Sequence, residues 1–326
     1  MEVGGLFGGI GGALLGAKRA GFNVLFNIEP RPFFNLDTFK NNFPGSYVYT
    51  SIKDATEKRV TLLIGSPDCK QFSNLGTKRK DKGKLHELNP ETFDYVKFIR
   101  YVEETQPDNF ILENVPNVLK TLWFEDNTLN FVGYENPVLS LPNYAIQTIK
   151  LNAVDFGVAQ NRRRAFVIGS RHFDPFFDLE ELKKTDFVKV GGRWNMGPSV
   201  EAAFKDVDKK PNQTMPRHSI KRVEGFRRLK FEESYYGTQN NKRLHPDKPS
   251  GVVASHCSRF VHPYKPRVLT VRESARLMGF PDHFIFHGTE TNQLDQVGKS
   301  IVPQVATAIS YYIKSKMEDA IERPYK

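Results

Sequence analysis

The chain has 326 residues, of which 39% are hydrophobic and 26% charged, as in a globular protein with one large domain or two moderate ones. Its two cysteines are too few for a disulfide framework or a structural zinc cluster, and no apolar run approaches the roughly 20 residues of a membrane span. The net charge of +10, from 47 basic and 37 acidic side chains, favours a polyanionic partner.

The first 30 residues predict a strand, a glycine-rich turn over residues 4–12, a helix over Ala13–Ala20 and a strand over Val24–Ile28 that ends at Glu29. Glycines let a ligand approach the backbone, and a carboxylate after the second strand can accept both hydroxyls of a ribose. Leu14 stands where a dinucleotide-binding turn has its third glycine, which favours S-adenosylmethionine over a dinucleotide. A plain structural turn is the alternative.

Two further strands are predicted over Val60–Ile64 and Asn109–Leu112, with a helix over Tyr95–Glu104 between them. This alternation predicts a parallel sheet with helices on both faces. Ligands in such sheets bind beyond the carboxyl ends of the strands, where Glu29, the loop of Cys69 and Glu113 are expected to meet.

Cys69 and Glu113 form a pair with a specific chemistry. A lone cysteine is usually a small buried hydrophobe, and a glutamate in a strand-end turn is often structural. Together, a thiolate can attack carbon 6 of a pyrimidine while the carboxylic acid protonates N3. Carbon 5 then becomes nucleophilic and can take a methyl group from a sulfonium.

From about residue 170 the regular pattern is lost. Residues 174–263 are rich in Pro, Lys, Arg, Asn and aromatics, which predicts a separate, loop-rich domain. Basic residues cluster over Lys78–Lys84 and Lys221–Lys230. Order returns with a helix over 267–280, capped by Thr270, and a final helix over 302–317.

The motifs, taken in order, resemble those of the DNA (cytosine-5)-methyltransferases. The similar segments are Gly5–Gly12, Pro67–Ser73, Glu113–Val115, Gln160–Arg164, Arg267–Asp282 and Gln296–Pro303. The resemblance covers residues 4–169 and 262–313, and the family places its variable target-recognition domain between them. It implies an α/β, doubly wound, mostly parallel sheet of the Rossmann-like methyltransferase type, with a smaller loop-rich second domain. The implied division is a catalytic and cofactor-binding domain over 1–170 plus 290–326, and a target-recognition domain with connecting segment over 171–289.

The resemblance also implies the reaction and the site residues. A methyl group would pass from S-adenosylmethionine to carbon 5 of a flipped-out cytosine in double-stranded DNA, through a covalent Cys69 adduct at carbon 6. Glu113 would hold and protonate the ring, and Arg162 and Arg164 would contact the flipped nucleotide. The predicted cofactor-binding residues are Leu6, Phe7, Gly9, Gly11, Gly12, Glu29, Ser51, Ile52, Pro67, Asn114, Lys299 and Ser300. The predicted DNA-binding residues are Lys70, Ser73, Lys78, Arg79, Lys80 and Gln160.

Four positions depart from the family pattern: Gly5 replaces Asp, Lys70 replaces Gln, Lys299 replaces Asn, and Ser51-Ile52 stands for Asp-Ile. Ordinary divergence explains each. The two added cations also permit a sharper hypothesis. Lys70, if close, would lower the pKa of Cys69, and Lys299 near the reactive end of the cofactor would attract an extra carboxylate. The donor would then be carboxy-S-adenosylmethionine and the product carboxymethylcytosine.

Two other functions stay open: a tRNA methyltransferase of the same architecture, and an inactive paralogue that binds DNA or a partner enzyme. The intact Cys69, Glu113, Arg162 and Arg164 argue against the inactive paralogue. The expected enzyme is a monomer in the cytoplasm of a bacterial or phage-infected cell, with a restriction nuclease as a candidate partner. The histidines of the variable region follow no metal-ligand spacing, so no metal is predicted, and His262-Pro263 is expected to be a structural turn.

Overall fold

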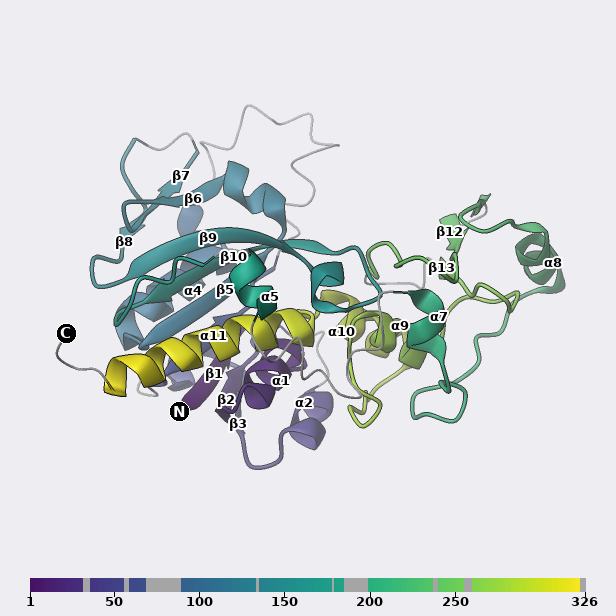
Figure 1. Cartoon of the computed structure of the whole chain (residues 1–326), viewed down its shortest axis with the longest axis horizontal. Helices are drawn as coiled ribbons and strands as arrows, with labels where there is room; N and C mark the ends of the chain where they lie inside the picture. Colours follow the sequence, from purple (N-terminus) through teal and green to yellow (C-terminus); the bar gives the residue numbers. More distant parts are fainter. Residues whose placement is uncertain are drawn as a thin grey trace.

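The computed structural model describes residues 1–31, 36–55, 59–68, 89–132, 135–177, 179–184, 199–236, 240–254 and 260–322. Two lobes lie side by side (Figure 1). The large lobe holds a seven-stranded sheet, and the small lobe holds short helices and strands.

The large sheet is mostly parallel, as predicted. Its strand order is β3-β2-β1-β4-β5-β10-β9. The first five strands of that order run parallel, and β10 runs antiparallel to both of its neighbours. The order changes direction beside β1, so a ligand crevice is expected where β1 and β4 end. The strands are β1 (Glu2–Leu6), β2 (Asn23–Ile28), β3 (Tyr47–Tyr49), β4 (Leu62–Gly65), β5 (Asn109–Asn114), β9 (Ala145–Asn152) and β10 (Arg163–Ser170).

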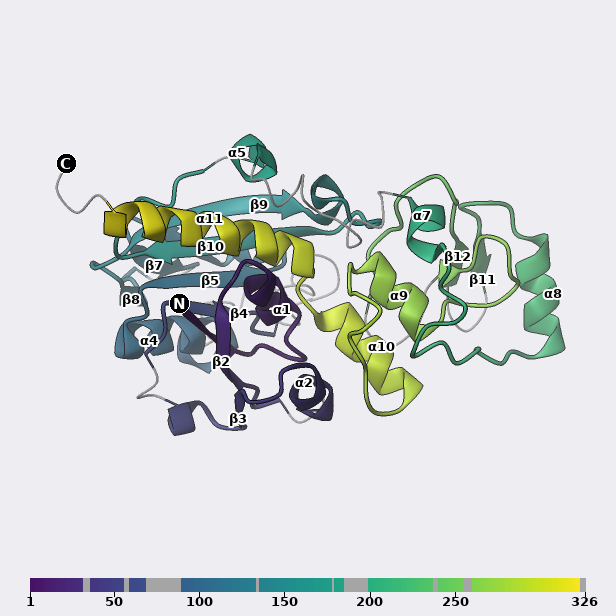
Figure 2. The same ribbon diagram turned by 60° about the horizontal axis from the view of Figure 1, so that its bottom comes forward.

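Helices cover both faces of this sheet (Figure 2). On one face, α1 (Gly12–Arg19) packs against α11 (Pro303–Glu322), and on the other lies α4 (Asp94–Thr105). Gly16 permits the first contact, because a Cβ there would lie 2.5 Å from the carbonyl oxygen of Pro303. These three helices confirm the ones predicted at the same places, and the doubly wound arrangement is confirmed with them.

Several short elements of the large lobe were not predicted. A second sheet of three antiparallel strands packs beside α4 through Leu122, Leu129 and Phe131, which join its hydrophobic core. These elements are α2 (Leu36–Asn42), η1 (Ile52–Ala55), η3 (Pro90–Thr92), η4 (Pro116–Lys120), β6 (Leu122–Glu125), β7 (Thr128–Phe131), β8 (Leu139–Ser140), η5 (Ala153–Phe156) and α5 (Leu179–Lys184).

The small lobe is built around α9 (Val271–Leu277). Thr270 caps this helix as predicted, in a reciprocal capping box with Glu273, although the helix is shorter than expected. Arg272 is fully buried and ties the lobe together through carbonyl oxygens of Pro211, Pro281 and Phe284. The other elements are α7 (Val200–Phe204), α8 (Ile220–Arg228), β11 (Ser234–Tyr236), β12 (Asn240–Arg243), β13 (Phe260–Val261) and α10 (Glu290–Lys299).

Residues 171–177 follow β10 and contact elements of the large lobe. Phe177 lies against Tyr312 of α11, with ring centroids 4.5 Å apart, and its carbonyl oxygen accepts a hydrogen bond from Gln147 of β9. These residues therefore pack against the large lobe, and the domain division at 170 stays a prediction. No helix among the described residues is both long and apolar enough to cross a membrane.

Candidate functional site

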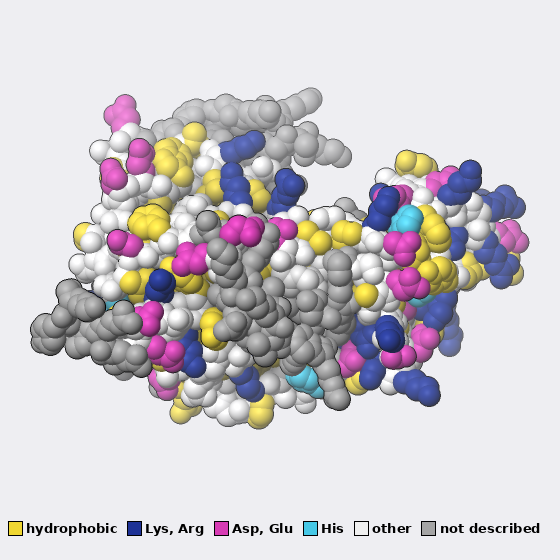
Figure 3. All heavy atoms as spheres, viewed as in Figure 1, with side chains coloured by type: hydrophobic (Ala, Val, Ile, Leu, Met, Phe, Trp, Pro, Cys, Tyr) yellow, Lys and Arg dark blue, Asp and Glu magenta, His cyan; other side chains and the backbone are white. Residues whose placement is uncertain are grey.

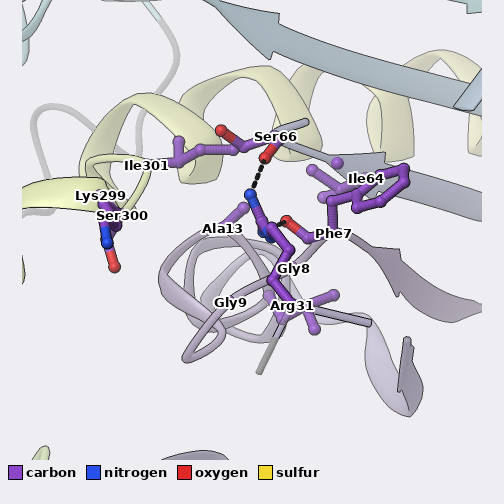
Figure 4. Close-up of a pocket in the computed structure, with 12 residues that line it drawn as sticks. Phe7, Gly8, Gly9, Ala13, Arg31, Ile64, Ser66, Lys299, Ser300 and Ile301 are labelled. Atoms are coloured by element: carbon purple, nitrogen blue, oxygen red, sulfur yellow. Dashed lines mark hydrogen bonds between the residues drawn. The ribbon is translucent and has the colours of Figure 1, made fainter. Parts of the chain in front are cut away.

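A glycine-rich turn forms the floor of a pocket where β1 and β4 end (Figure 4). Phe7, Gly9 and Gly11 adopt positive φ angles of 57°, 58° and 89°. Gly11 is the N-cap of α1. The empty space is about 320 Å³ and continuous with solvent. It is lined by Phe7, Gly8, Gly9, Ala13, Leu14, Arg31, Ile64, Gly65, Ser66, Lys299, Ser300 and Ile301.

Glu29 follows β2 and is buried beside this turn. Its Oε2 accepts a hydrogen bond of 2.7 Å from the backbone N–H of Gly9, and its own N–H donates to the carbonyl of Tyr49. Arg31 supplies three more hydrogen bonds to the same carboxylate, from its backbone N–H, Nε and Nη2. The sequence interpretation missed Arg31, and its only signal was a cation two residues after the predicted ribose acid.

Asn27 of β2 lies opposite Gly5, the position at which the family resemblance expects an Asp. The two strands pair with Gly5 opposite Asn27, and a Cβ added to Gly5 would lie 2.6 Å from Asn27 Oδ1. The Asn27 side chain therefore fills the space above this glycine. Its Nδ2 donates to the carbonyl of Gly9 at 3.0 Å, so Asn27 holds the turn from the neighbouring strand.

The far wall of the pocket comes from the C-terminal end of α10. Lys299 lines the pocket, but its Nζ lies 3.3 Å from Oδ2 of Asp295, so the added positive charge has an anionic neighbour. Gly12 allows close approach of this wall, because a Cβ there would lie 2.6 Å from the carbonyl of Ile301. Ser51 and Ile52 follow β3 and do not line this space.

Glu113 is the second-to-last residue of β5 and forms the second centre of the site. It is buried, with Oε2 accepting a 2.7 Å hydrogen bond from Ser66 Oγ and Oε1 lying 3.0 Å from Arg164 Nε. The next residue, Asn114, donates to the carbonyl of Pro67 at 3.3 Å. A second cavity beside Glu113 is lined by Arg162 and Arg164 among others. The structure thus brings together Glu113, Arg164 and the segment that leads into Cys69.

Gln160 and Arg162 occupy buried positions. Gln160, predicted to bind DNA, has its amide hydrogen-bonded to the N–H of Val253 and the carbonyl of Leu277. Arg162, predicted to contact the flipped nucleotide, donates to the carbonyls of Val253, Gly298 and Ser300. Gln160 therefore ties the start of β10 to the small lobe, and Arg162 joins the small lobe to the pocket wall. Gln160 is fully buried and presents no exposed surface to DNA.

The predicted nucleophile, Cys69, lies outside the described residues, as do Lys70, Ser73, Lys78, Arg79 and Lys80. Described residues lead directly up to it. Ser66 and Pro67, which precede it by three and two positions, are hydrogen-bonded to Glu113 and Asn114. The chain therefore enters the loop of Cys69 from a point fixed beside Glu113.

Basic side chains gather at the far end of the small lobe, over α8 (Figure 3). Lys221, Arg227, Arg228 and Lys230 are exposed, whereas Phe226 on the same helix is buried against Tyr235. The helix is thus held to the small lobe by Phe226, while its basic side chains face solvent, where they can contact phosphates.

The sequence profile of the C-5 cytosine-specific DNA methylases matches residues 1–315. The type II methyltransferase M1.HphI of Haemophilus parahaemolyticus is 31% identical over 94% of this chain and 84% of its own length. M.DdeI of Desulfomicrobium norvegicum is 27% identical over 98% of this chain and 90% of its own.

Solved structures agree on the fold. A prophage-encoded E. coli protein assigned as a DNA modification methyltransferase superposes with a TM-score of 0.69 at 24% identity, covering 98% of this chain and 99% of that one. The S. pombe Dnmt2 methyltransferase gives 0.63 at 17% identity, over 98% and 99%. With the glycine turn, the acids at the carboxyl ends of β2 and β5 and a profile match over nearly the whole length, the chain belongs to the C-5 cytosine-specific DNA methylase family.

Proposed function

We propose that this DNA (cytosine-5)-methyltransferase acts on a flipped-out cytosine of double-stranded DNA through a covalent bond between Cys69 and carbon 6. The observation that carries the proposal is the position of Glu113, buried and hydrogen-bonded to Ser66 three residues before Cys69. A carboxyl group fixed there can meet N3 of the same ring that the thiolate attacks.

The steps follow from the groups at the site. The Cys69 thiolate adds to carbon 6 as Glu113 gives a proton to N3, and the electron pair moves to carbon 5. Carbon 5 takes the methyl group, and the sulfonium donor leaves as a neutral thioether. A base from solvent removes the carbon 5 proton, the thiolate leaves carbon 6, and N3 returns its proton to Glu113, which restores the ring. Arg164 orients Glu113 through Nε at 3.0 Å. Arg162 and Gln160 act as positioning residues, since Gln160 binds backbone groups of the small lobe and Arg162 binds those of the small lobe and of the pocket wall.

The pocket residues fit an adenosyl cofactor. Gly8 and Gly9 present backbone without side chains, and Glu29 is held beside them by the N–H of Gly9. S-adenosylmethionine, when bound, supplies a methyl group on a positively charged sulfonium. Glu29 would accept the ribose hydroxyls, and Lys299 and Ser300 would close the opposite wall.

An anionic donor, carboxy-S-adenosylmethionine, is the less favoured alternative. It depends on Lys299 offering an uncompensated positive charge to the extra carboxylate. The 3.3 Å approach of Asp295 supplies an opposite charge on the same helix, which weakens that attraction. Plain S-adenosylmethionine is therefore the proposed donor.

The wider setting of the reaction is proposed on the same basis. The exposed cations of α8 would bind DNA phosphates while the small lobe reads the sequence. The curated relatives are type II methyltransferases, so a cognate restriction nuclease is the proposed partner system. The enzyme would act as a monomer in the cytoplasm of a bacterial or phage-infected cell.

Mass spectrometry of nucleosides from treated DNA tests the function. Plain and carboxylated S-adenosylmethionine are supplied in separate reactions, with tRNA as a competing substrate. We expect cytosine to gain one methyl group from the plain donor, and the Cys69→Ser and Glu113→Gln variants to give no product. A carboxymethyl product would establish the anionic donor, and no product on DNA with either donor would overturn the proposal.

Covalent trapping tests the adduct separately. DNA containing 5-fluorocytosine cannot lose a proton from carbon 5, so the bond to Cys69 should persist in a denaturing gel. Cys69→Ser should abolish the shifted band while leaving the melting temperature unchanged. Product formation without any trapped species would contradict the covalent mechanism.

A further inference from the structure

Glu29 uses its full capacity to accept hydrogen bonds without any contribution from a ribose. Its Oε2 accepts from the N–H of Gly9 at 2.7 Å and from Arg31 Nη2 at 2.5 Å. Its Oε1 accepts from the N–H of Arg31 at 3.0 Å and from Arg31 Nε at 2.6 Å. A carboxylate offers about four acceptor positions in all. The acid assigned to the ribose is therefore saturated.

The guanidinium of Arg31 also spans the pocket (Figure 4). Besides its two bonds to Glu29, it donates to the carbonyl of Phe7 at 2.8 Å and to that of Ser66 at 3.2 Å. These carbonyls follow β1 and β4, the two strands between which the crevice opens. Its Cζ lies 5.5 Å from the centre of the Phe7 ring, and the side chain is only 14% exposed. The group is thus inside the space that a nucleoside would enter.

The four bonds to Glu29 fall into two kinds. The two backbone donors are the N–H groups of Gly9 and Arg31. Their positions do not depend on the rotamer of the Arg31 side chain, so these two hydrogen bonds persist when that side chain moves. The two side-chain donors, Nε and Nη2, can leave by rotation of the side chain. A ribose offers two hydroxyls, which match the two side-chain bonds in number.

We propose that Arg31 competes with the cofactor ribose for Glu29 and thereby sets the affinity for the cofactor, an inference that rests on the proposed function of the pocket. A buried carboxylate without a partner is costly, so the guanidinium compensates Glu29 when no nucleoside is bound. Binding exchanges the guanidinium for the two hydroxyls. The measured association constant is then the intrinsic constant multiplied by the fraction of molecules in which Arg31 has released Glu29.

The test is calorimetric titration with S-adenosylhomocysteine, which carries the same ribose and cannot react. We expect Arg31→Ala to bind on the order of tenfold more tightly than wild type, because the competing side chain is gone. Arg31→Lys keeps the charge but loses the paired N–H groups, and its affinity should lie between the two. In a Glu29→Gln background, Arg31→Ala should have no effect. Arg100→Ala, which removes an exposed arginine paired with Glu91, is the control and should bind as wild type does.

Equal or weaker binding by Arg31→Ala, with binding retained by wild type, would overturn the competition and make the guanidinium a neutral or favourable neighbour of the cofactor. Thermal unfolding without ligand shows that each variant is folded, and Arg31→Lys gives the same comparison if Arg31→Ala is not. If folded wild type and all variants fail to bind S-adenosylhomocysteine, the proposed cofactor site itself is overturned, which is a different result from a failure of the competition alone.

Discussion

The imidazole of His262 should make the stability of the protein depend on pH. His262 is 5% exposed and stacks on Phe204, with ring centroids 5.3 Å apart. The backbone N–H groups of Tyr264 and Lys265 both donate to Nδ1, at 3.1 and 3.2 Å. The proton of the neutral ring is therefore assigned to Nε2, which faces Glu273 Oε1 at 3.7 Å. A second proton at Nδ1 would break two hydrogen bonds in a buried site.

Burial lowers the pKa of His262 to about 4, against the opposing attraction of Glu273 and with help from the nearby cations Arg267 and Lys265. In the unfolded chain the pKa is close to the ordinary value of about 6.5. Between these two values the unfolded state binds more protons, so stability is full above about pH 6.5 and falls as the pH drops toward 4. From pH 7.5 to pH 5.0, His262 alone should cost about 2 kcal/mol of unfolding free energy.

Urea unfolding at pH 7.5 and pH 5.0 measures this cost by comparison with His262→Asn. An Asn Oδ1 can accept the same two backbone hydrogen bonds but cannot gain a proton. We expect wild type to lose about 2 kcal/mol more than this variant between the two pH values. His172→Asn, which removes a histidine whose side chain is 42% exposed, should lose as much as wild type. Equal losses in wild type and His262→Asn would refute the reasoning.

Three further predictions concern the turn and the small lobe. Gly8→Ala should weaken S-adenosylhomocysteine binding in calorimetry, because its Cβ would lie 2.2 Å from Asn27 Oδ1, and Asn27→Ala should relieve that loss in the double variant. Arg272→Met should lower the unfolding free energy by about 3 kcal/mol or more in urea, because several buried carbonyls lose their donor. Thr270→Ala should cost about 1 kcal/mol in the same assay, and Thr270→Ser much less, because only the serine retains the capping hydroxyl.

Much of the site was predictable because parallel strands end at one edge of the sheet. Glu29 and the segment before Cys69 follow β2 and β4, and Glu113 lies near the end of β5. Alternation of apolar and polar runs was enough to predict all three strands. The predicted cap at Thr270 is confirmed, and the structure adds Glu273 as its reciprocal partner at the start of α9. These features depend on local chemistry, which a single sequence carries.

The contributions of Asn27 and α8 could not be predicted, for two different reasons. Asn27 reaches the glycine turn through the pairing of β1 with β2, and that register shifts between Val3 and Gly4. No local pattern reveals such a shift, because it depends on how two strands meet. The helix α8 buries only Phe226 among its nine residues, so it has no apolar period to detect.

The Gln-x-Arg-x-Arg motif, residues 160–164 at the start of β10, contacts parts of the site that would meet two different substrates, the target base and the methyl donor. Methyl transfer requires the target base and the methyl donor to meet within one site, although the two lobes approach it from different parts of the chain. Gln160 and Arg162 directly precede β10 and bind the backbone of Val253 in the small lobe, and Arg162 also binds that of Ser300 in the pocket wall. Arg164 reaches Glu113 two residues further on. The motif therefore holds the small lobe, the pocket wall and Glu113 relative to one another. If the proposed function is right, a change in any one of these side chains should affect the binding of both the base and the methyl donor.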